Sequence, residues 1–167
     1  MPSARISGGT VEIMMNDLFN AGFKRAIVHF DGSGDSGSIE SVDYFNDLDI
    51  DETDMSVLYK NALTDERYSY ESCSSTWDSA NTKWNETWEL VHVNANKLIE
   101  IIAEEKLEES DIDWYNGDGG FGQVEFHFDS KKIVLEINQR YTEFNSHTFT
   151  YGYLGKADVG EDVGEDY

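Results

Sequence analysis

Two stretches rich in glycine and acidic residues each adjoin a segment with strand character, and they limit the folds open to this chain. The first is FDGSGDSGSIE, residues 30–40, and the second is WYNGDGGFGQ, residues 114–123. Glycine adopts positive φ without strain, and carboxylates accept hydrogen bonds from nearby backbone. This composition is therefore typical of tight strand connections, or of loops that hold a cation or a polar ligand.

Alternation of apolar and polar residues predicts the strands. Residues 23–31 alternate in this way, residues 38–45 form a second strand after the glycine stretch, and together they predict an antiparallel hairpin. Residues 122–128 and 132–141 alternate around a turn at 129–131 and predict a second hairpin. Residues 144–151 are expected to add an edge strand. The side chains expected to face the core are Ala26, Val28, Phe30, Val124, Phe126, Phe128, Ile133, Leu135, Ile137 and Tyr141.

Helical periodicity occurs in three places. Residues 10–21 carry apolar side chains at helical spacing before Gly22, and a second short helix is expected near Leu58, with Asp51 or Thr53 as its cap. The longest periodic run predicts one long amphipathic helix of about 36 Å, at about 1.5 Å per residue. Its apolar positions are Trp84, Trp88, Val91, Ala95, Leu98 and Ile102. Residues 65–80 fit neither pattern.

These elements predict an α+β domain over residues 1–151: an antiparallel sheet of two hairpins, with about four to five strands, packed on one face by helices that include the long amphipathic helix. Residues 152–167 have little apolar surface, so a disordered acidic tail is expected. The chain has a single cysteine, no apolar run of the roughly 20 residues that span a membrane, and no apolar stretch of a secretory signal at its start. We therefore expect a cytoplasmic protein without membrane contact.

Acidic residues dominate the charge: 34 Asp and Glu against 12 Lys and Arg give a net charge of −22. Nine acids between Asp31 and Asp54 have no basic residue among them, and a second block runs from Glu104 to Asp118 with Lys106 alone. Such a field disfavours direct binding to nucleic acid and is typical of solubility, of steering or of a basic partner. Salt adaptation is an alternative, although such surfaces usually lose lysine, which here outnumbers arginine.

The segments FDGSGDSGSIES, WYNGDGGFGQVEF and LEINQRYTE together resemble a family of functionally uncharacterised domains from bacterial, plasmid and phage genomes. In that family a DGSGD-type hairpin precedes a helix and an NGDGGFG-type hairpin. The resemblance covers residues 23–45 and 114–143. It implies the same topology and a mobile-element origin, and it implies no activity.

A divalent metal site is one reading of the glycine stretches, with the candidate ligands His29, Asp31, Asp35, Asp118 and His127. The competing reading is turn chemistry, together with polar residues on the outer face of a sheet, where Glu125 or Glu136 would pair with Arg140. The tryptophans are assigned to the core or to a binding ridge. Neither a Gly-x-Ser-x-Gly nucleophile motif nor a Gly-Lys-Ser/Thr phosphate loop is present.

The sequence favours a non-enzymatic acidic binding protein, such as a phage or mobile-element DNA mimic that inhibits a nucleic-acid-handling or defence complex by covering its basic surface. Two alternatives stay open: a metal-dependent hydrolase that uses the glycine and aspartate stretches, and a self-associating accessory module that forms a homodimer. No cofactor other than a divalent metal is implied. The residues expected to bind a partner are Asp43, Asp47, Asp49, Asp51, Glu52, Asp54, Trp84 and Trp88.

Overall fold

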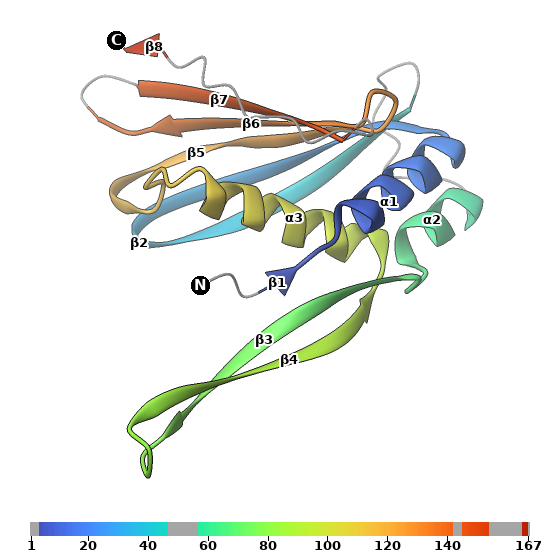
Figure 1. Ribbon diagram of the computed structural model, residues 1–167. Helices are drawn as coiled ribbons and strands as arrows, with labels where there is room; N and C mark the ends of the chain where they lie inside the picture. Colours follow the sequence, from blue (N-terminus) through green and yellow to red (C-terminus); the bar gives the residue numbers. More distant parts are fainter. Residues whose placement is uncertain (1–3, 47–56, 142–144, 154–164, 167) are drawn as a thin grey trace.

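The computed structural model describes residues 4–46, 57–141, 145–153 and 165–166, and its architecture confirms the α+β class (Figure 1). All strand pairs are antiparallel, in one sheet ordered β1-β3-β4 and a larger sheet ordered β2-β5-β6-β7-β8. The elements in chain order are β1 (Ala4–Arg5), α1 (Gly8–Asn20), β2 (Phe23–Asn46), α2 (Val57–Thr64), β3 (Tyr68–Asp78), β4 (Lys83–Val93), α3 (Ala95–Glu109), β5 (Asn116–His127), β6 (Lys132–Gln139), β7 (Asn145–Gly152) and β8 (Glu165–Asp166).

The long strand β2 doubles back on itself, which confirms the first predicted hairpin. A straight strand of 24 residues would be about 80 Å long, at about 3.3 Å per residue. Instead, His29 Nε2 lies 3.1 Å from Asp43 Oδ2, and the ring centroids of Phe23 and Tyr44 are 5.5 Å apart. Figure 1 shows the two halves side by side, with the reversal inside the first glycine stretch.

The second predicted hairpin, β5 and β6, is also confirmed. Val124 is paired with Leu135 and Phe126 with Ile133, and these side chains are fully buried. The turn at 129–131 forms as expected, and β7 adds to the far side of β6. The assignment of Tyr141 to the core was wrong. Strand β6 ends at Gln139, so the inward–outward alternation of the strand does not extend to Tyr141, which is 58% exposed.

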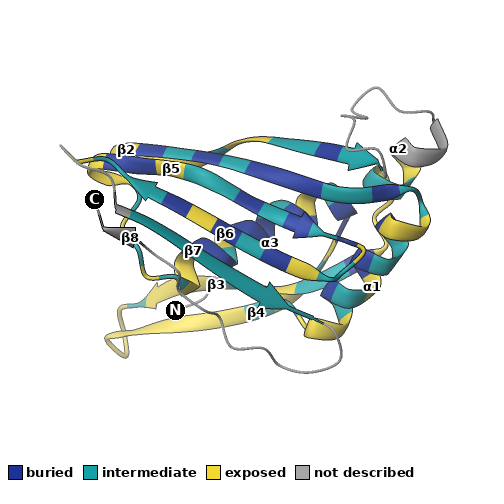
Figure 2. Cartoon of the chain, turned by 90° about the horizontal axis from the view of Figure 1, so that it is seen from above, coloured by how far each residue is buried: buried dark blue, intermediate teal, exposed yellow. Residues whose placement is uncertain are grey.

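Helices α1 and α3 cover one face of the large sheet, as expected, and the core lies between them (Figures 1 and 2). Met14, Met15 and Leu18 of α1 are fully buried, and so are Leu98 and Ile99 of α3. Both helices begin at a side-chain cap: Ser7 Oγ accepts a hydrogen bond from the Thr10 N–H, and Asn94 Oδ1 accepts one from the Lys97 N–H. Helix α2 forms where a short helix was expected, and Ala62 and Leu63 pack against the core, whereas the proposed caps lie outside the described residues.

The prediction of one long helix from Trp84 to Ile102 was wrong. Residues 68–93 form the antiparallel hairpin β3–β4, and α3 begins only at Ala95. A spacing of four fits a helical turn, but it is also even, so Trp84 and Trp88 lie on the same side of a strand. Thr87, Val91 and the two tryptophans favour a strand, and Asn94 starts the helix as its N-cap.

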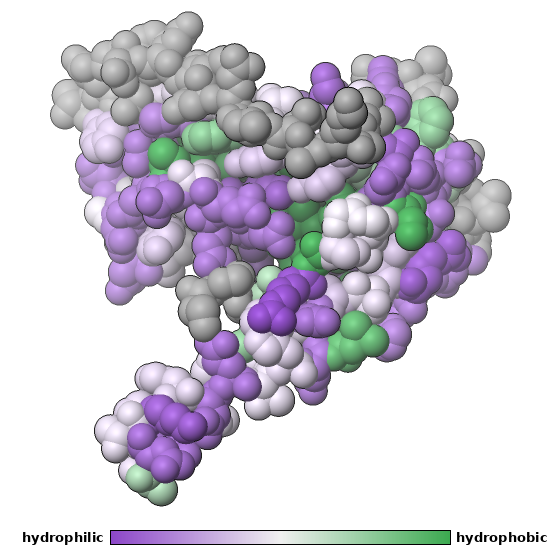
Figure 3. All heavy atoms as spheres, in the orientation of Figure 1, coloured by the Kyte–Doolittle hydropathy of each residue, from purple (hydrophilic) through white to green (hydrophobic). Residues whose placement is uncertain are grey.

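The β3–β4 hairpin extends away from the body of the molecule (Figures 1 and 3). Tyr68 and Val93 at its base are buried in the core, whereas most residues near its tip are exposed. The turn is held by Asp78, whose Oδ1 accepts hydrogen bonds from the N–H groups of Ala80 and Asn81 at 3.0 and 3.3 Å. No helix in the described part of the chain is long and apolar enough to cross a membrane.

Most of the expected tail, residues 152–167, lies outside the described residues. Within it, Glu165 pairs with Ser146 and Asp166 pairs with Asn145, so that β8 extends the large sheet beyond β7. Tyr153 packs against the core, and its N–H donates a hydrogen bond to the Lys131 carbonyl at 2.8 Å.

Candidate functional site

The two glycine stretches pair with each other, a relationship that the sequence did not predict. Gly32 is opposite Gly120, Gly34 is opposite Gly117 and Asp35 is opposite Asn116, with a register shift between Gly32 and Gly34. Gly119 has a φ of +71°, and a β-carbon there would overlap the backbone of Gly32. The glycines therefore permit a bulge and a close approach between β2 and β5.

The five candidate metal ligands do not converge. His29 is hydrogen-bonded to Asp43, Asp31 Oδ1 accepts a bond from Arg140 Nη2 at 2.9 Å, and His127 Nε2 lies 3.1 Å from Glu125 Oε2. Asp35 and Asp118 are exposed beside the paired glycines. Over the described ranges, no three His, Cys, Asp or Glu side chains lie close enough together to hold a metal ion. The described partners of these side chains are instead neighbouring protein groups, across strands for His29 and Asp31 and within β5 for His127.

Arg140 fastens the end of β6 to the reversal in β2. Its Nη1 donates to the Gly32 carbonyl at 3.0 Å, its Nη2 binds Asp31, and its guanidinium lies 5.1 Å from the ring centroid of Phe121. The expected pairing of Arg140 with Glu125 or Glu136 was wrong. The reason is that β2 lies next to β5 in the sheet, which brings Asp31 within reach.

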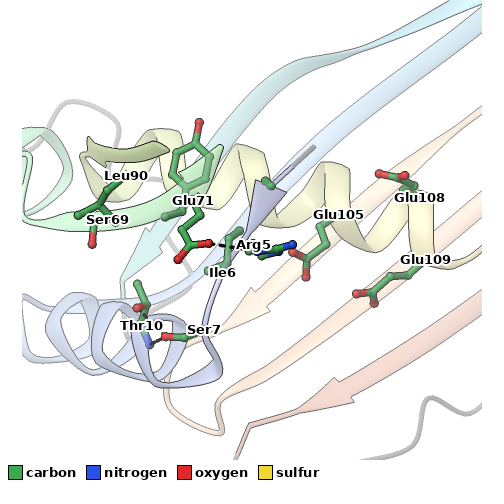
Figure 4. Close-up of a pocket in the computed structure, with 12 residues that line it drawn as sticks. Arg5, Ile6, Ser7, Thr10, Ser69, Glu71, Leu90, Glu105, Glu108 and Glu109 are labelled. Atoms are coloured by element: carbon green, nitrogen blue, oxygen red, sulfur yellow. Dashed lines mark hydrogen bonds and ion pairs between the residues drawn. The ribbon is translucent and has the colours of Figure 1, made fainter. Parts of the chain in front are cut away.

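A cleft of about 790 Å³ separates the small sheet from α3 (Figure 4). Its walls come from β1, the start of α1, the β3–β4 hairpin and the C-terminal end of α3. Arg5 is the cation in its lining, and Arg5 Nη1 already lies 3.5 Å from Glu71 Oε2. The other carboxylates in the lining, Glu105, Glu108 and Glu109, follow one another along α3.

A second cleft of about 510 Å³ lies on the other side of the same helix end, against the second half of β2. It is lined by the ring of Trp114 and by further carboxylates, with no cation among its lining residues. Glu108 contributes to both clefts. We call the carboxylates of the two clefts the acidic rim: Glu71, Glu104, Glu105, Glu108, Glu109, Asp111 and Asp113.

The acidic rim is only partly neutralised by the protein itself. Lys106 Nζ lies 3.5 Å from Glu105 Oε1 and 3.2 Å from Glu109 Oε2, and its ammonium is buried over the rings of Tyr151 and Tyr153. Burial raises the pKa of Glu105 in spite of this contact. Within the described residues, no cation lies within ion-pair distance of the exposed side chains Glu104, Glu108 and Asp111.

Except for Glu71, the residues of the acidic rim belong to the acidic block 104–118 that the sequence analysis identified, but their arrangement around two clefts was not predicted. Glu104 and Glu108 are four residues apart, as are Glu105 and Glu109, and this spacing forms two ridges once residues 95–109 are assigned to a helix. Of the acids chosen instead, Asp43 is bound to His29, whereas Asp47, Asp49, Asp51, Glu52 and Asp54 lie outside the described residues.

The two tryptophans expected to bind a partner lie on β4, not on a helix. Trp84 is 65% exposed and is paired across the hairpin with Trp77, which is 50% exposed, and their ring centroids are 5.4 Å apart. The assignment of these two rings to the core was therefore wrong, because the hairpin extends beyond the body of the molecule. Trp88 is half-buried beneath the guanidinium of Arg5, 3.6 Å from its ring centroid.

Comparison with known proteins gives a family and no function. Residues 9–151 match the model of a family described as "Family of unknown function (DUF6878)". Searches of curated proteins and of solved structures found no match. Because the family match covers most of the chain, it supports the expected relationship to uncharacterised domains, whereas the mobile-element origin stays a prediction.

Proposed function

We propose that this chain, which belongs to the family of unknown function DUF6878, is a non-enzymatic acidic binding protein that occupies a basic surface of a partner protein. The observation that carries the proposal is the acidic rim. Carboxylates line both clefts, and the single cation of the two linings, Arg5, is already paired with Glu71. Such a concave, one-sign surface focuses its field on a partner of opposite charge.

The layout of the rim supports a finer proposal, that of a DNA mimic. Four carboxylates, Glu104, Glu105, Glu108 and Glu109, occur within six residues of α3, or roughly 9 Å of helix at about 1.5 Å per residue. Lys106 lies in the same six residues, so the net density is one negative charge per roughly 3 Å, whereas duplex DNA has one per about 1.7 Å. Lys106 neutralises part of this charge, whereas Glu104, Glu108 and the nearby Asp111 keep theirs.

The partner that fits this layout is a protein with a groove for nucleic acid, such as a host defence or nucleic-acid-handling complex. A phage or mobile-element protein that covered such a groove would act as its inhibitor. Direct binding of nucleic acid by the acidic rim would place like charges together, and a net charge of −22 opposes it over the whole chain.

A competition experiment tests the proposal. The protein is immobilised as wild type, as the rim variant Glu104→Gln/Glu108→Gln/Asp111→Asn, and as a control variant with the same charge change outside the clefts, Glu66→Gln/Asp129→Asn/Glu136→Gln. Bacterial lysate is passed over each with and without added duplex DNA. The expected partners bind DNA, are displaced by it, and are lost from the rim variant but kept by the control.

Two results would overturn the proposal. Partners that remain bound in excess duplex DNA would show that no nucleic-acid groove is covered. Partners kept equally by the rim variant and by wild type would show that the clefts are not the contact. Thermal unfolding of all three proteins checks that the substitutions leave the fold intact, as expected for exposed side chains.

A further inference from the structure

One face of the β3–β4 hairpin carries large side chains that the core does not use. Residues directly opposite in an antiparallel pair share a face, so the register Trp77 to Trp84, Cys73 to Trp88 and Glu71 to Leu90 defines it. Leu90 is 62% exposed, and Trp77 and Trp84 are at least half exposed. We call this set the aromatic face: Trp77, Trp84, Glu86, Trp88 and Leu90.

The inner half of the aromatic face already holds an arginine. The guanidinium of Arg5 lies 3.6 Å from the ring centroid of Trp88, and its Nη1 lies 3.5 Å from Glu71 Oε2. Arg5 is opposite Glu71 in the pairing of β1 with β3, so the ring and the carboxylate approach the guanidinium from the same sheet. This is a cation–π contact combined with an ion pair, within one chain.

The outer half of the aromatic face also combines tryptophan rings with a carboxylate, but it holds no arginine of the described residues. Trp84 and Trp77 provide two exposed rings, and Glu86 follows Trp84 by two residues, which places its side chain on the same face. Within the described residues, no cation lies within ion-pair distance of Glu86, and Glu86 is exposed. Strand β1, which supplies Arg5, pairs with Glu71 and Ser72 in the described part of the chain, on the inner half of the hairpin.

We propose that the outer half of the aromatic face binds an arginine side chain of the basic partner, with the rings of Trp77 and Trp84 beneath the guanidinium and Glu86 as its counter-ion. The inference rests on the proposed function, since it names the chemistry of one contact with that partner. Arginine fits better than lysine because its planar guanidinium stacks on a ring and presents a fork of donors to a carboxylate.

A second copy of this chain does not fit the same position. Two chains of net charge −22 repel each other, and each of the four arginines of the chain already has a partner. Arg5 lies on Trp88, Arg67 binds Asp65 and Arg140 binds Asp31, while Arg25 lies 4.6 Å from the ring centroid of Phe45. The occupant is therefore an arginine-bearing segment of another protein.

Packing within the hairpin accounts for only part of this arrangement. A cross-strand pair of tryptophans stabilises a hairpin, and Trp77 and Trp84 meet edge to face in this way. Stabilisation of the hairpin requires neither the exposed ring faces nor the carboxylate of Glu86 on the same face. If the rings only stabilise the hairpin, peptides with arginine and with lysine should bind equally well, whereas an arginine site should favour the arginine peptide.

The test uses two labelled peptides of equal length and charge, one with arginine and one with lysine as its only basic residue type. Fluorescence anisotropy at low salt measures their binding to the full chain. The wild type is expected to bind the arginine peptide about two- to five-fold more tightly. In Trp77→Leu/Trp84→Leu this ratio is expected to fall to about one with lysine affinity unchanged, whereas Trp84→Tyr, which keeps a ring, retains most of it.

Three controls separate the explanations. Glu86→Gln is expected to lower the preference for the arginine peptide. The rim variant Glu104→Gln/Glu108→Gln/Asp111→Asn is expected to weaken the binding of both peptides by the same factor. Leu90→Ala, on the inner half of the aromatic face, is expected to change neither the arginine preference nor the affinity for either peptide. In the wild type, the arginine peptide should shift the indole N–H signals of Trp77 and Trp84 in an NMR titration, a measurement that needs no substitution.

Each remaining outcome is decisive. Equal affinity for the two peptides in the wild type would overturn the arginine site and leave the proposed acidic function standing. A preference for arginine that survives Trp77→Leu/Trp84→Leu would place the arginine elsewhere and also overturn the site. No binding of either peptide at low salt would overturn both proposals.

Discussion

The indole ring of Trp114 lies directly over Gly37, so closely that a β-carbon at residue 37 would overlap its six-membered ring. Trp114 follows α3, and Gly37 lies just after the reversal in β2, so this contact joins the helical layer to the sheet. The ring also meets Phe30 edge to face, with centroids 5.1 Å apart. The glycine at residue 37 thus serves packing, and it has no need of positive φ.

Gly37→Ala is therefore expected to destabilise the protein by about 1–3 kcal/mol, since the ring must move away from Phe30 and the second cleft. The free energy of unfolding in urea measures the effect. Gly8→Ala is the matched control, because nothing lies within 4 Å of the added β-carbon, and it should leave stability unchanged or slightly higher. Equal stability of Gly37→Ala and wild type would show that Trp114 is not held in this position.

Asn94→Ala should lower the free energy of unfolding by about 1 kcal/mol, because the Asn94 side chain caps α3 through the Lys97 N–H at 2.8 Å. Asn94→Asp keeps an acceptor oxygen at this position and should lose much less. Urea unfolding followed by circular dichroism provides the measurement. If α3 instead began before Asn94, the alanine variant would be as stable as wild type or more so.

Glu105→Gln should reduce the dependence of stability on pH. Burial raises the pKa of Glu105, so the folded state binds the proton more tightly than the unfolded state does, and stability rises as pH falls through the folded pKa. We expect wild type to gain stability between about pH 7 and about pH 4, while the variant gains less over the same range. An identical gain in both proteins would contradict the assignment of the effect to Glu105.

Replacing the first acidic block should slow association with a basic partner. The six-fold variant Asp43→Asn, Asp47→Asn, Asp49→Asn, Asp51→Asn, Glu52→Gln and Asp54→Asn has fewer negative charges to steer the encounter. The Debye length of about 8 Å at physiological salt limits the reach of such charges. Stopped-flow association with the arginine peptide at low salt should show a lower on-rate. Removal of charge from a self-repelling chain should leave stability unchanged or higher, except for the loss of the His29 contact to Asp43.

An unchanged on-rate in the six-fold variant, with affinity flat from low to high salt, would contradict electrostatic steering by this block. The contact would then depend on the aromatic face, whose arginine preference is less sensitive to salt than charge steering.

Light scattering of the free protein tests the self-associating alternative, which a stable dimer would support.

Alternation with a period of two was sufficient to predict the β5–β6 hairpin and the doubling of β2. Val124, Phe126, Ile133 and Leu135 all face the core, because strands beneath a helical layer bury every second side chain. Near the tryptophans, helical periodicity predicted the wrong element. Residues four apart share a face in a helix and in a strand, so Trp84 and Trp88 could not distinguish the two, and only the pairing with β3 decided between them.

The amino-acid sequence by itself determined the α+β class, the charge of −22 and the positions of the acidic blocks, because these depend on composition and on local periodicity. Tertiary structure decided what those residues do. The glycine stretches, some 85 residues apart, pair with each other, and Arg140 reaches Asp31 through that pairing. The acidic rim likewise exists only because the end of α3 lies beside β1 and β3 at one cleft and beside the second half of β2 at the other. The aromatic face exists only because β3 pairs with β4. Such contacts between distant segments depend on tertiary packing, which local periodicity does not determine.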